Sequence, residues 1–198
     1  MDTTTTRRSG FARTAGIIGL GGGLLGAVFA AYELATLPYE VSFATNAVAA
    51  VAHLAVIVAL GGLAALGAAG SGWWGRAGIG VAILGWTALT VAELVEPFDE
   101  ASAMPMFEIA PLVIGAGMLL VGVAVLRARH WSGWRRIVPL VIGAYVFVVF
   151  LPVAIAVATD AGFWAVLLGW FLGYAALGLA VVVEAPVPAG SPERARVA

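Results

Sequence analysis

Long apolar stretches fill most of the chain, and short polar or glycine-rich segments separate them. A helix crosses the hydrocarbon core of a bilayer, about 30 Å thick, with roughly 20 apolar residues. Six stretches reach that length: Thr14–Leu37, Ala44–Ala68, Gly78–Val95, Phe107–Leu126, Ile137–Ala158 and Phe163–Val183. The pattern predicts an all-α, polytopic membrane bundle of six transmembrane helices, because the short connections leave no room for a soluble domain.

The two ends of the chain differ from this apolar centre. We expect residues 1–13 to form a cytoplasmic tail and residues 14–183 to form a single transmembrane domain. Residues 184–198, which are rich in proline and arginine, have the composition of a disordered cytoplasmic tail, and residues 1–10 read the same way.

The arginines predict the orientation of the helices. Loops on the cytoplasmic side of a membrane carry an excess of basic residues. With six spans, all ten arginines fall on one side: Arg7, Arg8, Arg13, Arg76, Arg127, Arg129, Arg135, Arg136, Arg194 and Arg196. An odd number of spans would break this sorting, so we expect both termini to be cytoplasmic. An alternative interpretation, that Arg7 and Arg8 begin a secretion signal cleaved near Ala30, conflicts with the length of the first apolar run.

Composition supports a membrane protein and removes several kinds of chemistry. The chain is 62% hydrophobic and 11% charged, with a mean hydropathy of +1.03, whereas soluble domains carry about 25% charged residues. It contains no cysteine, which excludes disulfides, thiolate metal sites and cysteine nucleophiles. All its basic residues are arginines and it is rich in alanine, glycine and valine, which suggests a bacterial plasma membrane as its location.

Polar residues inside the spans are the candidates for function. Glu33, Glu93 and Glu108 each lie about one turn inside a span, at the outer end predicted for it. An ionisable residue at that depth costs a few kcal/mol unless it faces protein or water. Asn46 and His53 share a face of the second span, seven residues apart. We therefore expect these five residues to surround a polar or ion site, to act as hydrogen-bonding contacts between helices, or only to extend to the membrane interface.

Small residues continue the faces on which two of these carboxylates lie. Gly19, Gly22 and Gly26 share a face of the first span with Glu33. On the fourth span, Glu108 lies on one face with Pro111, Gly115 and Gly122. Small residues allow close helix contacts in lipid, which predicts that both faces are packed against neighbouring helices. The remaining outer carboxylates are expected to be solvated: Glu40, Glu96, Asp99, Glu100 and Asp160.

Motifs for other chemistry are missing from the sequence. No nucleophile elbow, phosphate loop or zinc-protease motif is present, so the catalytic residues stay unknown. Carboxylates with one imidazole suit several metals, but the second histidine, His130, falls in the basic loop, and we expect neither a metal site nor a cofactor. That loop interleaves tryptophans with Arg127, Arg129, Arg135 and Arg136, which fits anionic lipid headgroups better than nucleic acid.

The stretch from Ala124 to Val149 contains Leu-Arg-Ala-Arg-His-Trp-Ser-Gly-Trp-Arg-Arg-Ile-Val-Pro-Leu-Val-Ile-Gly, followed by an aromatic-rich span. It resembles small six-span membrane proteins of actinobacteria. The resemblance covers spans four to six and implies the same topology, and it implies no activity.

Three functions remain open at this stage. The first is an accessory or structural membrane protein, as a homo-oligomer or with a partner membrane protein. The second is a small transporter or a cation- or proton-binding protein that uses the outer carboxylates. The third is an intramembrane enzyme in which a buried carboxylic acid acts on a lipid or isoprenoid, since burial raises the pKa of such an acid. A filled bundle favours the first, an aqueous cavity the second, and a dry side pocket with one carboxylate the third.

Overall fold

A computed structural model describes residues 3–37, 41–156 and 160–185 of the chain, except the side chains of residues 3–8, 156 and 160. The described residues form helices and no strand, which confirms the predicted all-α class. The helices are α1 (Thr3–Ala35), α2 (Phe43–Ala65), α3 (Trp73–Val95), α4 (Glu100–Ala128), η1 (Gly133–Ile137), α5 (Val138–Tyr145), η2 (Val146–Phe150), α6 (Leu151–Ala156) and α7 (Asp160–Glu184).

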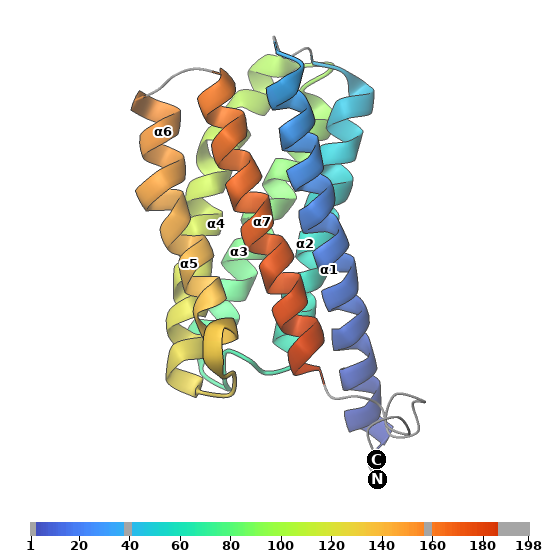
Figure 1. Cartoon of the computed structure of the whole chain (residues 1–198), viewed down its shortest axis with the longest axis vertical. Coiled ribbons are helices and arrows are strands. Elements are labelled where there is room, and N and C mark those ends of the chain that lie inside the picture. The colour runs from blue at the N-terminus through green and yellow to red at the C-terminus, as the bar shows by residue number, and fades with distance from the viewer. Residues whose placement is uncertain (1–2, 38–40, 157–159, 186–198) are drawn as a thin grey trace.

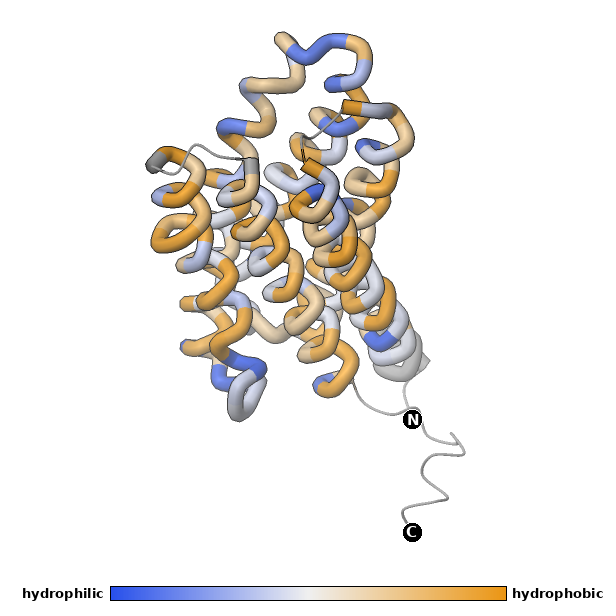
Figure 2. The backbone as a smooth tube through the Cα atoms, turned by 45° about the horizontal axis from the view of Figure 1, so that its top comes forward, coloured by the Kyte–Doolittle hydropathy of each residue, from blue (hydrophilic) through white to orange (hydrophobic). Residues whose placement is uncertain are grey.

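Six of these helical segments are long and apolar enough to cross a membrane. They are Ser9–Ala35, Phe43–Ala65, Trp73–Val95, Glu100–Ala128, Gly133–Ile155 and Ala161–Glu184. Figure 2 shows hydrophobic residues along the length of the bundle and hydrophilic ones concentrated near its two ends. The six predicted spans are therefore confirmed as apolar helices of membrane-crossing length.

The six spans form a closed ring of antiparallel neighbours (Figure 1). α1 packs against α2 and α7, α3 packs against α2 and α4, and α5 lies between α4 and α7. The short connections explain this order, since they join helices that run side by side in opposite directions. α1 begins and α7 ends at the same end of the bundle, as an even number of spans requires.

Three helices begin at least five residues earlier than the sequence predicted. α1 starts at Thr3, so residues 3–10, expected in a disordered tail, are helical. α3 starts at Trp73 rather than Gly78. α4 starts at Glu100 rather than Phe107, because the Asp99 side chain accepts a hydrogen bond from the Ser102 amide and caps the helix. Most of the expected C-terminal tail, from residue 186 onward, lies outside the described residues.

The fifth span is irregular, unlike the other five. It passes from the 3-10 helix η1 through α5 to the π-helical segment η2, and then to α6. The Leu151 amide bonds to the Val146 carbonyl, five residues back, just before Pro152, which has no amide hydrogen to donate. α6 then packs mainly against η2 and α7, and Figure 1 shows it at the edge of the bundle.

Glycines on α1 make close contacts with two neighbouring helices. A Cβ at Gly22 would collide with Ala55 of α2, and one at Gly26 would collide with the Phe171 ring of α7. Gly23 lies equally close to Ala175 of α7. The predicted small-residue face of α1 is therefore a contact face, because only glycine lets these backbones approach so closely.

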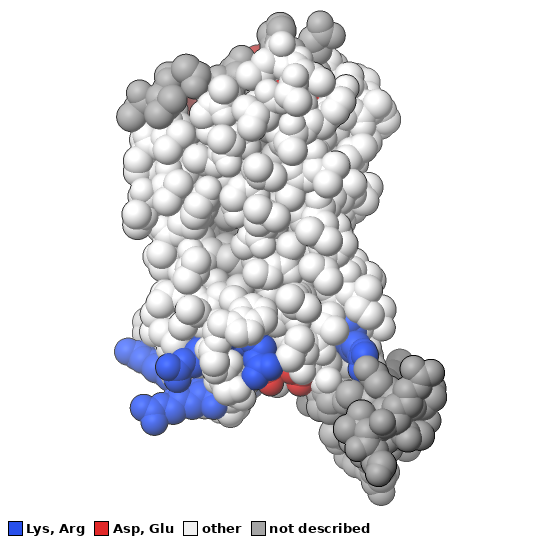
Figure 3. Space-filling model, viewed as in Figure 1, with Lys and Arg blue, Asp and Glu red and all other residues white. Residues whose placement is uncertain are grey.

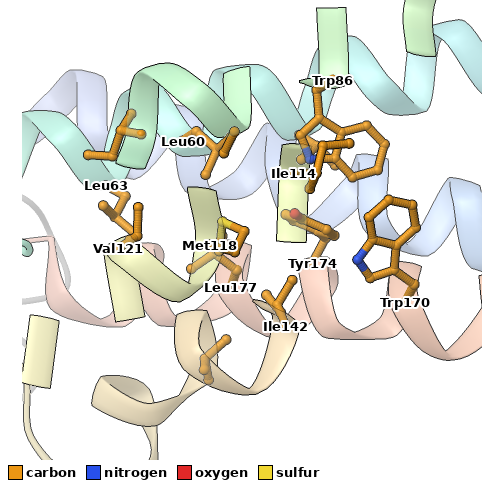
Figure 4. Packing of buried hydrophobic residues seen from close by; sticks show 14 of the residues in the cluster. Leu60, Leu63, Trp86, Ile114, Met118, Val121, Ile142, Trp170, Tyr174 and Leu177 are labelled. Atoms are coloured by element: carbon orange, nitrogen blue, oxygen red, sulfur yellow. The ribbon is translucent and has the colours of Figure 1, made fainter. Parts of the chain in front are cut away.

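Large side chains fill the space inside the ring (Figure 4). The largest fully buried ones come from α2, α3, α4, α5 and α7: Trp86, Trp170, Tyr174, Leu60, Leu63, Ile114, Met118, Ile142, Leu177, Val56, Val121 and Val125. α1 contributes mainly small residues to the interior. The bundle is therefore packed through its centre in the manner of a protein core.

Candidate functional site

Asn46 forms the best-defined polar contact at the end of the bundle opposite the termini. It lies in the first turn of α2, which the Ser42 hydroxyl caps by accepting a bond from the Thr45 amide. The Asn46 amide nitrogen donates to the backbone carbonyl of Glu93 at 3.1 Å and to Glu96 Oε2 at 2.6 Å. These bonds join α2 to the C-terminal end of α3, and Asn46 itself is completely buried.

Glu96 was expected to be solvated, and this prediction is wrong. Its side chain is half-buried and accepts the short bond from Asn46. The sequence feature that could have predicted this contact is the spacing of Glu96 from Glu93. The two lie three residues apart on one face of α3, and Asn46 was expected on the neighbouring helix. Asp99 and Glu100 are exposed, as expected. Glu40 and the Asp160 side chain lie outside what the structure describes.

Asp99 is exposed in the turn between α3 and α4, and its charge is stabilised locally. The Ser102 hydroxyl donates to Asp99 Oδ2 at 2.6 Å, and the Ser102 amide donates to Oδ1 at 3.2 Å. These hydrogen bonds hold the pKa of the Asp99 carboxyl below its usual value, because they favour the charged form. Asp99 is therefore a helix cap.

Glu33 is buried on α1, with 3% of its surface exposed. Among the described residues, its Oε1 atom has no hydrogen-bond partner. α1 packs against α2 and α7, whereas Glu93 belongs to α3 on the other side of α2. A buried carboxyl oxygen without a partner is costly in a membrane span, so Glu33 differs from the hydrogen-bonded Asn46.

His53 lies near the middle of α2, within a group of aromatic side chains. Its ring centroid is 4.9 Å from that of Trp86 on α3 and 5.9 Å from that of Phe171 on α7, to which it is nearly parallel. The side chain is buried, and its Nδ1 atom has no hydrogen-bond partner within the described part of the chain. No described polar contact links it to Asn46, although both lie on one face of α2.

The aromatic group continues beyond His53 through the centre of the bundle. Trp86 stacks on Trp170 at 4.9 Å and meets Tyr174 edge-on at the same centroid distance. Figure 4 shows these three side chains next to one another, with their polar atoms inside the core. In the described structure the two indole nitrogens and the Tyr174 hydroxyl are buried without a hydrogen bond of good geometry, although the Trp86 indole faces the Tyr174 hydroxyl. The sequence placed these residues within spans but did not connect them with His53.

Glu108 is exposed on α4, so the structure does not bring it together with the other candidates. Gly115 and Gly122, on the same face, do pack tightly, against Val146 and Leu140 of the fifth span. That contact does not extend up to Glu108, because the span continues as α6, which packs mainly against η2 and α7 and not against α4. The five predicted residues therefore occupy several places: Asn46 beside Glu93, Glu33 on α1, His53 in the aromatic group, and Glu108 on the surface.

The basic residues gather at the opposite end, where α1 begins and α7 ends (Figure 3). Arg127, Arg129 and Arg136 are exposed. Arg135 forms an ion pair with Glu184, with 2.8 Å between Nε and Oε1, and donates from Nη2 to the Ser132 hydroxyl at 2.7 Å. Glu184 was expected to begin the tail, but it is the last residue of α7, and its ion pair with Arg135 joins that helix to η1.

Within residues 3–37, 41–156 and 160–185, no group of three or more His, Asp or Glu side chains is close enough to hold a metal ion. No protein-family model, no curated protein and no solved structure matches the chain.

Proposed function

We propose that this chain is an accessory or structural component of a bacterial plasma membrane. The observation that carries the proposal is the filled interior. Side chains from five of the helices pack against one another through the centre of the ring, from Leu63 to Trp170 (Figure 4). A transport pathway needs a water-filled or solute-sized space among the helices, and a centre packed in this way offers little room for one.

Three hydrogen-bonded polar side chains support the same proposal, since each joins two separate elements. Asn46 links α2 to α3, and the Tyr145 hydroxyl donates to the Val166 carbonyl, linking α5 to α7. His130 Nδ1 lies 2.9 Å from the Gly67 carbonyl, which joins the two loops at the basic end. Such bonds between helices contribute about 0.6 kcal/mol each on average, and up to about 1.7 kcal/mol.

The proposed orientation places the basic end of the bundle in the cytoplasm. Arg76, Arg127 and Arg136 all belong to this end, whereas Glu93 and Glu100 belong to the other. The excess of basic residues on cytoplasmic loops supports this assignment, with both termini inside the cell. The resemblance to six-span proteins of actinobacteria agrees with it and is part of the proposal.

A second candidate function is favoured by one observation, the unpartnered polar atoms of Glu33 and His53. Buried polar groups in proteins nearly always have partners, and exceptions mark catalytic roles, strain, or a bound water or ion. The second candidate is therefore a cation- or proton-binding protein that uses Glu33 and His53.

Ion flux through proteoliposomes distinguishes the two functions. We expect liposomes with the full-length protein and a pH-sensitive dye to acidify, under an imposed proton gradient, no faster than empty liposomes. Faster acidification would overturn the structural proposal. If Glu33→Gln then abolished the flux while Glu108→Gln, a matched change of an exposed carboxylate, preserved it, the second candidate would take its place.

A further inference from the structure

A groove of about 920 Å³ lies on the outside of the bundle at its basic end. Its walls are the turn between α2 and α3, the first residues of α3, and the C-terminal half of α4. Among the described residues, its lining contains no carboxylate. The groove therefore lacks the acid that an intramembrane enzyme of the kind considered above would need, and it calls for another explanation.

The α4 wall of the groove is apolar and lies within a membrane-crossing segment. Ala116, Leu120 and Val123 line it at positions i, i+4 and i+7, which places them along one face of the helix. Ala116 and Val123 are exposed on the protein surface. In a bilayer this wall would lie among acyl chains, because the surrounding span is apolar.

The groove changes character at the end of α4. Arg127 and His130 line it there, one turn beyond Val123, together with Ser71 and the exposed indole of Trp74. His130 is engaged by the Gly67 carbonyl, which joins the loop after α4 to the turn after α2. Arg127 has no hydrogen bond or ion pair with any residue that the structure describes, in contrast to Arg135, which is paired with Glu184. An available guanidinium thus lies at the mouth of an apolar groove.

We propose that this groove binds one anionic phospholipid from the leaflet at the basic end. One acyl chain lies along α4 from Val123 towards Ala116, and the phosphate lies against the Arg127 guanidinium. The charge of Arg127 complements the phosphate, and arginine binds phosphate oxygens with two parallel hydrogen bonds. The volume is at the upper end of the roughly 300–1,000 Å³ typical of small-molecule sites. The proposal goes beyond the proposed function and holds for either candidate.

Thermal unfolding of delipidated full-length protein in detergent tests this site. Phosphatidylglycerol should raise the unfolding midpoint in a saturable manner, phosphatidylcholine with the same chains should raise it much less, and soluble glycerol phosphate should have no effect. Arg127→Gln should weaken the apparent affinity for phosphatidylglycerol roughly fivefold, as expected for about 1 kcal/mol per basic residue at an anionic surface. Arg136→Gln, an exposed arginine at the same end that does not line the groove, should leave that affinity unchanged.

The groove itself is tested by Ala116→Trp, which places an indole where the acyl chain would lie. Native mass spectrometry of the unaltered protein should show one retained phosphatidylglycerol, and this variant should lose it. Equal stabilisation by both lipids, or the same loss with Arg136→Gln as with Arg127→Gln, would overturn the proposal. A concentration-dependent dimer that Ala116→Trp abolishes would also overturn it, because a second copy would then occupy the groove.

Discussion

Asn46 illustrates, at the scale of a single residue, how polar groups stabilise this bundle. It is buried at the start of α2, and its amide donates to the Glu93 carbonyl and to Glu96 Oε2. Without Asn46, both acceptors would lose their bond to α2. Because one of them is a carboxylate, this contact should be at the strong end of the range for hydrogen bonds between membrane helices.

Replacement of Asn46 should therefore destabilise the protein measurably. We expect Asn46→Ala to lower the free energy of unfolding by about 1–2 kcal/mol. Thr87→Val is a suitable control, because within the described part of the chain the exposed Thr87 hydroxyl bonds only to the Ile83 carbonyl of its own helix. Denaturant unfolding in detergent micelles measures both variants, and equal stability of the two would show that Asn46 does not join α2 to α3.

The candidate site could be predicted from the sequence only in part. The positions of Asn46, Glu33 and His53 within their spans indicated that they are buried. A polar side chain inside a membrane span is costly in lipid and therefore faces the other helices. The position of Glu108 depended on where the fifth span leaves α4, and hence on the π-helical segment and Pro152. Hydrophobic pattern carries no information on such a change of helical path, so Glu108 was assigned to a packed face.

At the scale of helices, glycine decides how closely α1 approaches its neighbours. Gly22 faces Ala55 and the Ala52 carbonyl of α2, whereas its neighbour Gly21 has open space where a Cβ would be. Both glycines lie inside α1, so replacing either one by leucine changes the intrinsic helix propensity by the same amount. The difference between them isolates the contribution of helix contact.

We expect Gly22→Leu to destabilise the bundle and Gly21→Leu to be neutral or slightly stabilising. The first forces α1 away from α2, and overpacking of this kind costs about 1–3 kcal/mol or more. The second replaces glycine by a better helix former at an exposed position, which favours the helix by up to about 1 kcal/mol. Thermal unfolding of the two variants provides the measurement, and equal midpoints would remove the argument for a contact face.

Helices themselves were predicted better than their ends. Apolar length alone indicated six spans, since roughly 20 residues are required at each crossing. The early starts of α1 and α4 were missed because the spans were predicted from apolar length, and Thr3–Gly10 and Glu100–Met106 are polar or contain proline. Hydropathy indicates which residues contact lipid, and it does not indicate where a helix begins. The Asp99 cap followed by Ser102 was the available signal for α4.

At the scale of the whole molecule, the six described spans form a filled ring with charges sorted between its ends. Arginines occupy the end where α1 begins and α7 ends, and carboxylates such as Glu93, Glu96 and Glu100 occupy the other. We propose that this ring spans a membrane with its basic end in the cytoplasm. A bundle of this kind buries its large side chains inside and presents apolar residues such as Val28 and Leu84 to lipid.

Labelling of single cysteines in intact cells tests this orientation, because the chain contains no cysteine of its own. Ala101→Cys places a thiol at the exposed start of α4, and Ser71→Cys places one in the exposed turn at the basic end. We expect a membrane-impermeant maleimide to label Ala101→Cys in intact cells and Ser71→Cys only after the membrane is permeabilised. Labelling of Ser71→Cys in intact cells, or of neither variant until the cells are opened, would rule out a bundle that spans the membrane with its basic end in the cytoplasm.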